Sequence, residues 1–236
     1  MKSEHPRTRR ARGFVIGALA TLGLVAAPSL AGDLYVVHGI PGSDLGLPNA
    51  LPVDIGLDGG CTPLLDVEFG QSALAGTLDA GIYQAEVFLA NGAGCSGTLA
   101  VTADIEIPVA GTVFAIAHLD QNGVPTLSQY TASLGDIPTG FAKVQVVHTA
   151  AAPAVDVRFK GKGPKPKISD LGPGEQSFAD QLATTPYKVQ VRPATGGKPV
   201  LELDGVSFSG DAYTSVFAVG TPSSGTFTVV PVEVSP

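Results

Sequence analysis

Apolar and polar residues alternate along much of the chain. Residues 99–107 place an apolar side chain at every odd position, with Thr102, Asp104 and Glu106 between them. Residues 187–192 alternate in the same way. A period of two indicates strands that have one buried and one solvated face.

Other apolar and β-branched runs predict further strands near residues 34–38, 52–57, 64–69, 82–90, 112–119, 126–130, 143–148, 154–160, 199–208, 213–219 and 226–234. Asn122-Gly123 lies between two of these runs and indicates a hairpin, because both residues accept a positive φ. The 30 Gly and 19 Pro residues interrupt the 236-residue chain too often to leave room for long helices. At 44% hydrophobic residues, the chain can still bury a sizeable core. We therefore predict an all-β fold.

A set of short motifs occurs twice in the same order. Val-Val-His ends at His38 and again at His148, and a Val-Asp pair follows, ending at Asp54 and at Asp156. The first copy has an insertion around residues 42–50. Two later matches keep the order, residues 81–87 with 185–191 and residues 111–114 with 210–213. About seven strands in each copy is typical of an immunoglobulin-like sandwich, so we predict two tandem antiparallel β-sandwich domains, residues 32–136 and 141–236.

The N-terminus has the pattern of an export signal. A basic leader precedes an apolar run from Phe14 to Ala27, and Ser29-Leu30-Ala31 has small residues at both positions that signal peptidase recognises. The apolar run is shorter than the roughly 20 residues that span a bilayer. We predict a signal peptide over residues 1–31, cleaved near Ala31, by the general or the twin-arginine route. The mature protein is then periplasmic, surface-located or secreted, with no membrane span.

Export would alter the charge of the protein. The predicted leader contains five basic residues and one acidic residue, so its removal changes the formal net charge from −7 to about −11. A strongly acidic protein is repelled by nucleic acid and by anionic membranes. Neither is an expected partner.

Export also gives a role to the only two cysteines. Cys61 and Cys95 both lie in glycine-rich, turn-like segments. An oxidising compartment favours a disulfide between them. A redox pair would more usually have the Cys-x-x-Cys spacing, so we predict a structural bridge.

The second copy carries an ordered set of motifs most clearly. They are Val146-Val147-His148, Ala154-Val155-Asp156, the strand Tyr187 to Pro193, and the strand that runs from Tyr213-Thr214 to Gly220. This set resembles the family called domain of unknown function 4397, and the first copy is similar but departs at Phe88-Leu89 and Ala117-His118. The resemblance covers nearly all of residues 34–234. It implies an exported bacterial or archaeal β-sandwich protein with no established activity.

The recurring polar residues are the main candidate site. His38 with Asp54, and His148 with Asp156, end strands in both copies. A histidine that donates to an aspartate could orient a metal ligand or a base. The same pair could instead tie two strands or a turn together, and we favour this structural role. His118 could join His38 and Asp54 at a metal only if their strands converge, so we predict no metal site.

Two loops offer weaker candidates. Asp120-Gln121-Asn122-Gly123 is similar to the start of a calcium loop but lacks the later ligands. Lys160, Lys162, Lys165 and Lys167 make a basic loop on an acidic protein, which could contact an acidic polymer or could simply be solvated.

The motifs of common enzymes are missing from the sequence. It contains no Gly-x-Ser-x-Gly elbow, His-Glu-x-x-His pair, phosphate loop or dinucleotide fingerprint. We predict no catalytic residues, no cofactor and no enzymatic activity. The expected function is that of an exported interaction or structural module of the cell envelope, with an unknown protein or envelope polymer as partner. The alternative is a metal-binding or glycan-binding extracellular module. The absence of Trp weakens the glycan option, although five Tyr remain.

Overall fold

A computed structural model describes residues 30–132 and 135–234, and almost all of its regular structure is β-strand. The predicted signal peptide lies outside the described residues except for its last two positions. The elements are β1(Ala31–His38), η1(Gly42–Leu45), β2(Val53–Leu57), β3(Gly60–Cys61), β4(Ser72–Asp79), β5(Gly81–Leu89), β6(Leu99–Ile107), β7(Thr112–Leu119), β8(Pro125–Thr131), β9(Phe141–His148), β10(Val155–Gly161), β11(Lys167–Leu171), β12(Gln176–Ala183), β13(Tyr187–Pro193), β14(Leu201–Val206), β15(Ala212–Val219), η2(Pro222–Ser224) and β16(Thr228–Val234).

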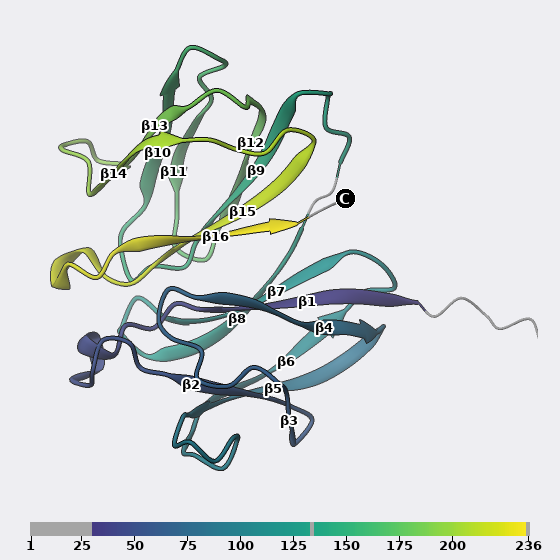
Figure 1. Ribbon diagram of the computed structural model, residues 1–236. Coiled ribbons are helices and arrows are strands. Elements are labelled where there is room, and N and C mark those ends of the chain that lie inside the picture. The colour runs from purple at the N-terminus through teal and green to yellow at the C-terminus, as the bar shows by residue number, and fades with distance from the viewer. Residues whose placement is uncertain (1–29, 133–134, 235–236) are drawn as a thin grey trace, which may run out of the picture.

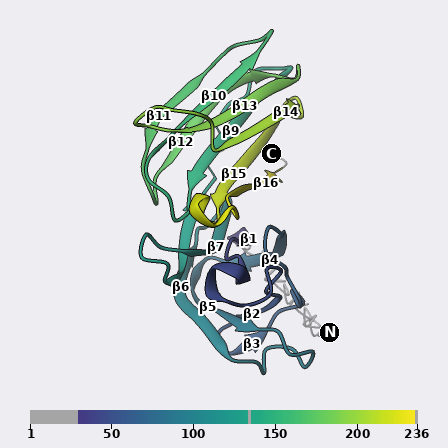
Figure 2. The ribbon, with the colours of Figure 1, turned by 90° about the vertical axis from the view of Figure 1, so that its left-hand side faces the viewer.

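The strands form four sheets of four, which lie in layers (Figures 1 and 2). The first sandwich pairs the sheet β4-β1-β7-β8 with the sheet β3-β2-β5-β6, and the second pairs β12-β9-β15-β16 with β11-β10-β13-β14. The two sandwiches therefore have the same strand order. The all-β prediction is confirmed.

Two strand pairs depart from the antiparallel pattern. β1 runs parallel to β7, and β9 runs parallel to β15 at the equivalent place. The remaining strand pairs are antiparallel. Alternation along a strand shows which residues share a face, but not in which direction a neighbouring strand runs.

One strand prediction was wrong, and four strands were missed. Residues 64–69 contribute only an isolated bridge between Val53 and Val67, and Asp66 and Gly70 have positive φ angles that interrupt an extended strand. The missed strands β3, β4, β11 and β12 are each at the end of their sheet. An edge strand has one neighbour and much exposed surface, so its sequence carries a weaker apolar pattern.

The predicted hairpin at Asn122-Gly123 is confirmed. β7 and β8 pair antiparallel on either side of it, and Gly123 has a φ of 76°. The Asp120 carboxylate accepts the backbone N–H groups of Asn122 and Val124, both at 2.8 Å. These bonds hold the pKa of Asp120 below its usual value, chiefly through the bond from Val124. The hairpin therefore already uses the carboxylate that sequence analysis compared with a calcium ligand.

The two sandwiches share an apolar cluster. β7 and β15 face the centre of the molecule, and β7 is buried along its whole length. Phe114 of β7 packs edge-on against Phe217 of β15, with ring centroids 5.2 Å apart, and Tyr130 of β8 lies 6.5 Å from Phe217. We call this set the central cluster, and its buried members are Val37, Phe114, Ile116, Ala132, Val147, Tyr213, Phe217, Val219, Val230, Val232 and Val234.

Polar contacts cross the same interface. The Tyr130 hydroxyl donates to the Gly174 carbonyl at 3.1 Å, and the Gln121 amide donates to the Ala150 carbonyl at 3.2 Å. The Thr226 hydroxyl donates to Asp44 at 2.9 Å. Asp44 belongs to η1, inside the insertion of the first copy. The packing and these bonds fix the two sandwiches relative to one another.

The predicted disulfide is confirmed. Cys61 of β3 and Cys95 of the β5–β6 loop are bonded, with their Cα atoms 5.5 Å apart. The bridge holds a two-residue edge strand to a loop that follows the neighbouring strand β5.

Loss of the disulfide should destabilise the protein. Cys61→Ser with Cys95→Ser is expected to lower the free energy of unfolding by about 3–4 kcal/mol, because the bridge closes a loop with a sequence separation of 34. Urea unfolding of the oxidised protein and of the double variant measures the difference. Equal midpoints for the two proteins would contradict the expected stabilisation.

Candidate functional site

In the first sandwich, His38 ties the end of β1 to the segment that follows the insertion. Its side chain is buried at 1% exposure, and Nε2 donates to the Leu51 carbonyl at 2.8 Å. Nδ1 accepts the backbone N–H of Ile40 at 3.5 Å. Burial lowers the pKa of His38, against a smaller opposing effect of the Leu51 bond, so the ring is neutral near pH 7.

Asp54 holds a different turn. One of its carboxylate oxygens accepts the backbone N–H of Asp66 at 3.0 Å, and Asp66 has a φ of 55°. The hydrogen bonds found among the described residues do not link Asp54 to His38. The two residues are both buried, but each fastens its own loop.

The second sandwich repeats both ties. His148 donates from Nε2 to the Pro153 carbonyl at 3.0 Å, and Asp156 accepts the backbone N–H of Asp170 at 3.1 Å. Asp170 has a φ of 54°, matching Asp66. The repeated polar residues therefore hold equivalent loops in equivalent places. Sequence analysis found the four side chains but not their partners, because the partners are backbone atoms.

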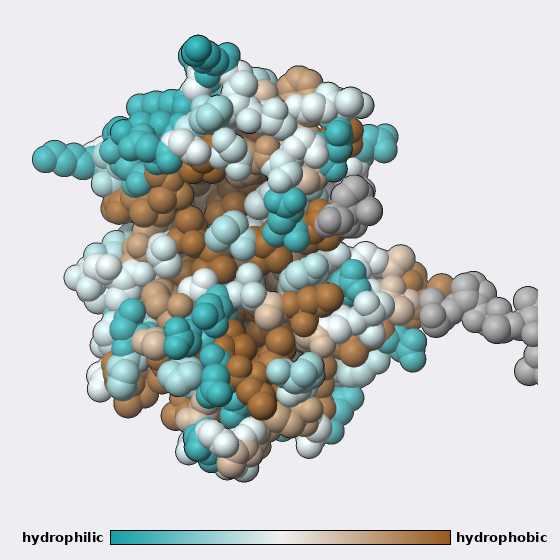
Figure 3. Space-filling view, in the orientation of Figure 1, coloured by the Kyte–Doolittle hydropathy of each residue, from teal (hydrophilic) through white to brown (hydrophobic). Residues whose placement is uncertain are grey.

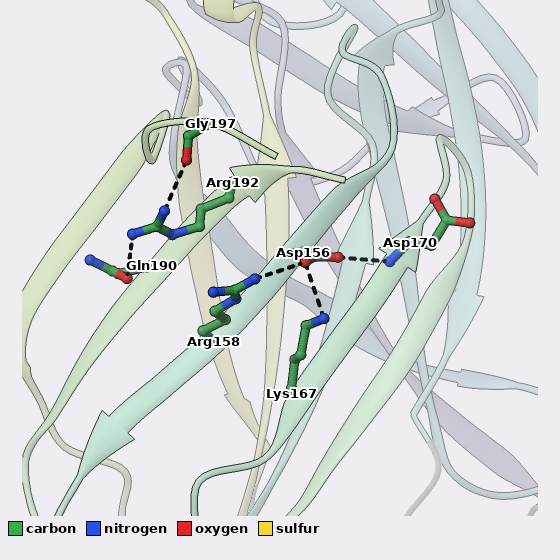
Figure 4. A network of polar contacts seen from close by, with 7 residues as sticks. All are labelled: Asp156, Arg158, Lys167, Asp170, Gln190, Arg192 and Gly197. Carbon is green, nitrogen blue, oxygen red and sulfur yellow. Dashed lines mark hydrogen bonds and ion pairs between the residues drawn. The ribbon is translucent and has the colours of Figure 1, made fainter. Parts of the chain in front are cut away.

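Asp156 has two further partners on the outer face of its sheet. Its second oxygen lies 3.3 Å from Arg158 Nη2 and 3.2 Å from Lys167 Nζ (Figure 4). The pKa of Asp156 is lowered, chiefly by the hydrogen bond from the Asp170 backbone and then by these two cations. Lys167 is thus an ion-pair partner, while Lys160, Lys162 and Lys165 of the basic loop are exposed.

One difference separates the two histidines. Both are buried and both donate from Nε2, but Nδ1 of His148 has no hydrogen-bond partner among the described residues. Burial also lowers the pKa of His148, partly opposed by the Pro153 bond and by Glu175. The neutral ring, with its proton on Nε2, presents Nδ1 as a buried acceptor.

His118 does not join His38 and Asp54. It alternates with Ala117 on β7, which places its ring on the opposite face of the sheet, toward the second sandwich. Its Nε2 lies 2.8 Å from the Ser128 hydroxyl. Burial lowers the pKa of His118. Among the described residues, no three His, Cys, Asp or Glu side chains gather as a metal site would require.

The side-chain ties should contribute to stability. His38→Ala is expected to lower the free energy of unfolding by about 2 kcal/mol, because the buried Leu51 carbonyl loses its donor and a void replaces the ring. Urea unfolding measures this, with the exposed Lys162→Ala as a control that should change little. A stable His38→Ala protein that had lost a ligand would contradict the structural role.

A cavity in the second sandwich was missed by sequence analysis. It has a volume of about 440 Å³ and lies between the two sheets, where its walls are mainly Val, Leu and Phe side chains. His148 contributes to the wall, and residues of β14 and β16 line the side where Figure 3 shows an apolar recess. The alternating pattern predicts which faces are buried, but it does not show how far apart the sheet edges lie.

The family model for a domain of unknown function, DUF4397, matches residues 32–158, just over half of the chain. The chain belongs to the DUF4397 family. The match runs through the first sandwich and into β10. It includes His38, Asp54, His148 and Asp156, although Asp170, the backbone partner of Asp156, lies beyond the matched residues.

Other comparisons add little to the DUF4397 assignment. No curated protein matches the chain. A crystal structure of a candidate adhesin from Bacteroides ovatus has 9% sequence identity and a TM-score of 0.25, over 80% of this chain and 88% of that one. A fimbrial anchor protein from Porphyromonas gingivalis has 10% identity and a TM-score of 0.24, over 87% of this chain and 98% of that one. Similarity at this level does not establish a shared fold or function.

Within the described residues of this DUF4397 protein, none of the helices has the length and apolar character to cross a bilayer.

Proposed function

We propose that this DUF4397 protein is an exported, non-enzymatic interaction module of the cell envelope. The observation that carries the proposal is the central cluster, whose packing joins the two sandwiches into a single unit. A body of this kind presents loops and sheet faces at fixed positions, which lowers the entropy lost when a partner binds.

The conspicuous polar side chains support a binding role over a catalytic one. His38, Asp54, His148 and Asp156 each hydrogen-bond to a backbone atom of a loop. A catalytic group needs access to substrate, whereas these side chains are buried and hold the scaffold in shape.

The disulfide supports a location outside the cytoplasm. Structural disulfides persist in oxidising compartments and are rare where thiols are kept reduced. The expected signal peptide and the acidic charge of the mature chain agree with export.

Co-sedimentation with isolated envelopes tests the proposal. The purified, oxidised protein is mixed with envelopes of the organism that encodes it, and an unrelated acidic protein of similar size serves as the control. We expect saturable sedimentation of this protein and none of the control. A protein that stays in the supernatant at every envelope concentration would contradict an envelope-binding role.

A further inference from the structure

Charge is divided unevenly between the two sandwiches. Residues 32–136 contain 12 acidic residues and no Lys or Arg, whereas residues 141–236 contain 8 acidic and 9 basic residues. With His neutral, the formal net charges are −12 and +1. A carboxylate of the first sandwich therefore has no Lys or Arg of its own sandwich with which to pair.

The basic residues gather on the outer sheet of the second sandwich. Eight of the nine belong to β10, β11, β13 or the loops beside them: Arg158, Lys160, Lys162, Lys165, Lys167, Lys188, Arg192 and Lys198. Asp156 pairs with two of these cations, and Glu202 and Asp204 pair with a third. The other five take part in no ion pair among the described residues. This sheet therefore keeps an unbalanced positive charge, and we call its outward side the basic face.

The same side of the first sandwich carries the opposite charge. Counted from the aligned Val-Asp motifs, the registers of β2 with β5 and of β10 with β13 place Asp58 where the second sandwich has Lys160. They also place Gln84 where it has Lys188. At this pair of positions an acidic and a neutral residue thus replace two lysines.

The neighbouring strand β6 extends the acidic charge. Asp104 and Glu106 are exposed and alternate with the buried Ile105 and Ile107, so their side chains lie on the outward side of the sheet. Asp104 stands opposite Gln84 in the register, and the Gln84 N–H donates to Asp58 at 2.8 Å. We call this outward side of the sheet β3-β2-β5-β6 the acidic face.

The acidic and basic faces lie at opposite ends of the molecule (Figures 1 and 2). The central cluster packs the sheet β4-β1-β7-β8 on the sheet β12-β9-β15-β16, so the other two sheets are the outermost layers. Because the same packing fixes the sandwiches, one copy cannot bring its own two charged faces together. Two copies placed in line can do so.

We propose that copies of this chain associate head to tail, with the acidic face of one copy against the basic face of the next. A contact between two different surfaces leaves one face of each kind free at the ends, so further copies can add. The inference goes beyond the proposed function and does not depend on it, because the purified protein associates without an envelope.

A second copy fits the basic face better than an anionic polymer does. Like charges crowded on one sandwich repel each other, and a complementary surface relieves that repulsion. A polymer would neutralise the basic face alone, whereas association between copies neutralises the acidic face as well.

Sedimentation velocity of the oxidised, purified protein tests the association. In about 0.01 M salt we expect the mean sedimentation coefficient to rise with protein concentration. In about 1 M salt it should stay at the monomer value, since the range of exposed charges falls from about 30 Å to about 3 Å.

Two charge-reversed variants test the head-to-tail arrangement. Lys160→Glu with Lys162→Glu alters the basic face, and Asp104→Lys with Glu106→Lys alters the acidic face; all four side chains are exposed. Each variant alone should associate more than about tenfold more weakly, because like charges then meet. An equal mixture of the two should regain association, because acidic faces again meet basic ones.

A matched control separates the acidic face from total charge. Glu68→Lys with Asp79→Lys makes the same change in net charge at exposed positions off the acidic face, and should leave association unchanged. If a reversed variant fails to fold by circular dichroism, Lys160→Gln with Lys162→Gln or Asp104→Asn with Glu106→Gln replaces it. Each of these should also weaken association.

Three results would overturn the proposal. The protein could stay monomeric in low salt at every concentration; binding of poly-L-glutamate would then assign the basic face to an anionic polymer. Association could survive 1 M salt or both reversed variants, which would place the contact on another surface. The mixture of reversed variants could fail to regain association, which would show that the two faces do not meet each other.

Discussion

Phe217→Ala is expected to lower the free energy of unfolding by about 3–5 kcal/mol, the range for removing a buried aromatic ring. Phe217 is fully buried, and its ring contacts Phe114 and Tyr130 of the other sandwich. The loss should therefore fall on the interface between the sandwiches. Urea unfolding should show a lower midpoint, with the single transition splitting as the sandwiches begin to unfold separately.

Phe159→Ala is the matched control for this variant. Phe159 is 3% exposed and packs against Tyr187 and Phe208, both within the second sandwich. Its loss should cost a similar free energy without separating the first sandwich from the second. If Phe217→Ala cost less than about 1 kcal/mol, the central cluster would not be what holds the two sandwiches together.

Acid should destabilise the protein before its carboxylates are protonated. Burial lowers the pKa of His38, His118 and His148, so the folded state keeps these rings neutral while the unfolded state protonates them near pH 6.5. The unfolded state then binds more protons, and stability falls as pH drops below about 6.5. Each histidine lowers the free energy of unfolding by up to about 1.4 kcal/mol for each pH unit. The three together lower it by up to about 4 kcal/mol for each pH unit.

Unfolding free energies measured between pH 8 and pH 4.5 check this dependence. Above pH 7 the histidine contribution should be constant. His118→Gln should reduce the slope by about one third while the other two rings still titrate. Below about pH 4 a separate loss is expected, because the lowered pKa values of Asp120, Asp156 and Glu202 mean that their stabilisation disappears as they take up protons. A flat profile from pH 7 to pH 5 would contradict neutral burial of the histidines.

Much of the fold follows from local sequence pattern. β6 and β13 alternate clearly because one face of each packs on a core, and the repeated Val-Val-His motif marks β1 and β9 as equivalent central strands. β7 shows no alternation because layers cover both of its faces. Edge strands such as β12 have an apolar pattern too weak to predict a strand. The parallel pairing of β1 with β7 could not be predicted either, because it arises only when the sheet assembles.

The site was less predictable than the fold. Repetition pointed to His38 and His148, but nothing local could show that the Nδ1 of His38 has a partner and the Nδ1 of His148 does not. That difference depends on backbone positions in the folded loops. The cavity likewise is lined by residues far apart in sequence, such as Val144 and Pro231, which come together only when the two sheets of the second sandwich pack.

The central claim is that this protein acts outside the cytoplasm as one disulfide-bonded binding body. Intact mass after thiol alkylation, measured on protein recovered from each cell fraction of the encoding organism, tests it most directly. We expect a chain that begins near Gly32, carries no alkylated cysteine and occurs in the extracytoplasmic fractions. A chain recovered only from the cytoplasm, with its leader intact and both cysteines alkylated, would contradict it.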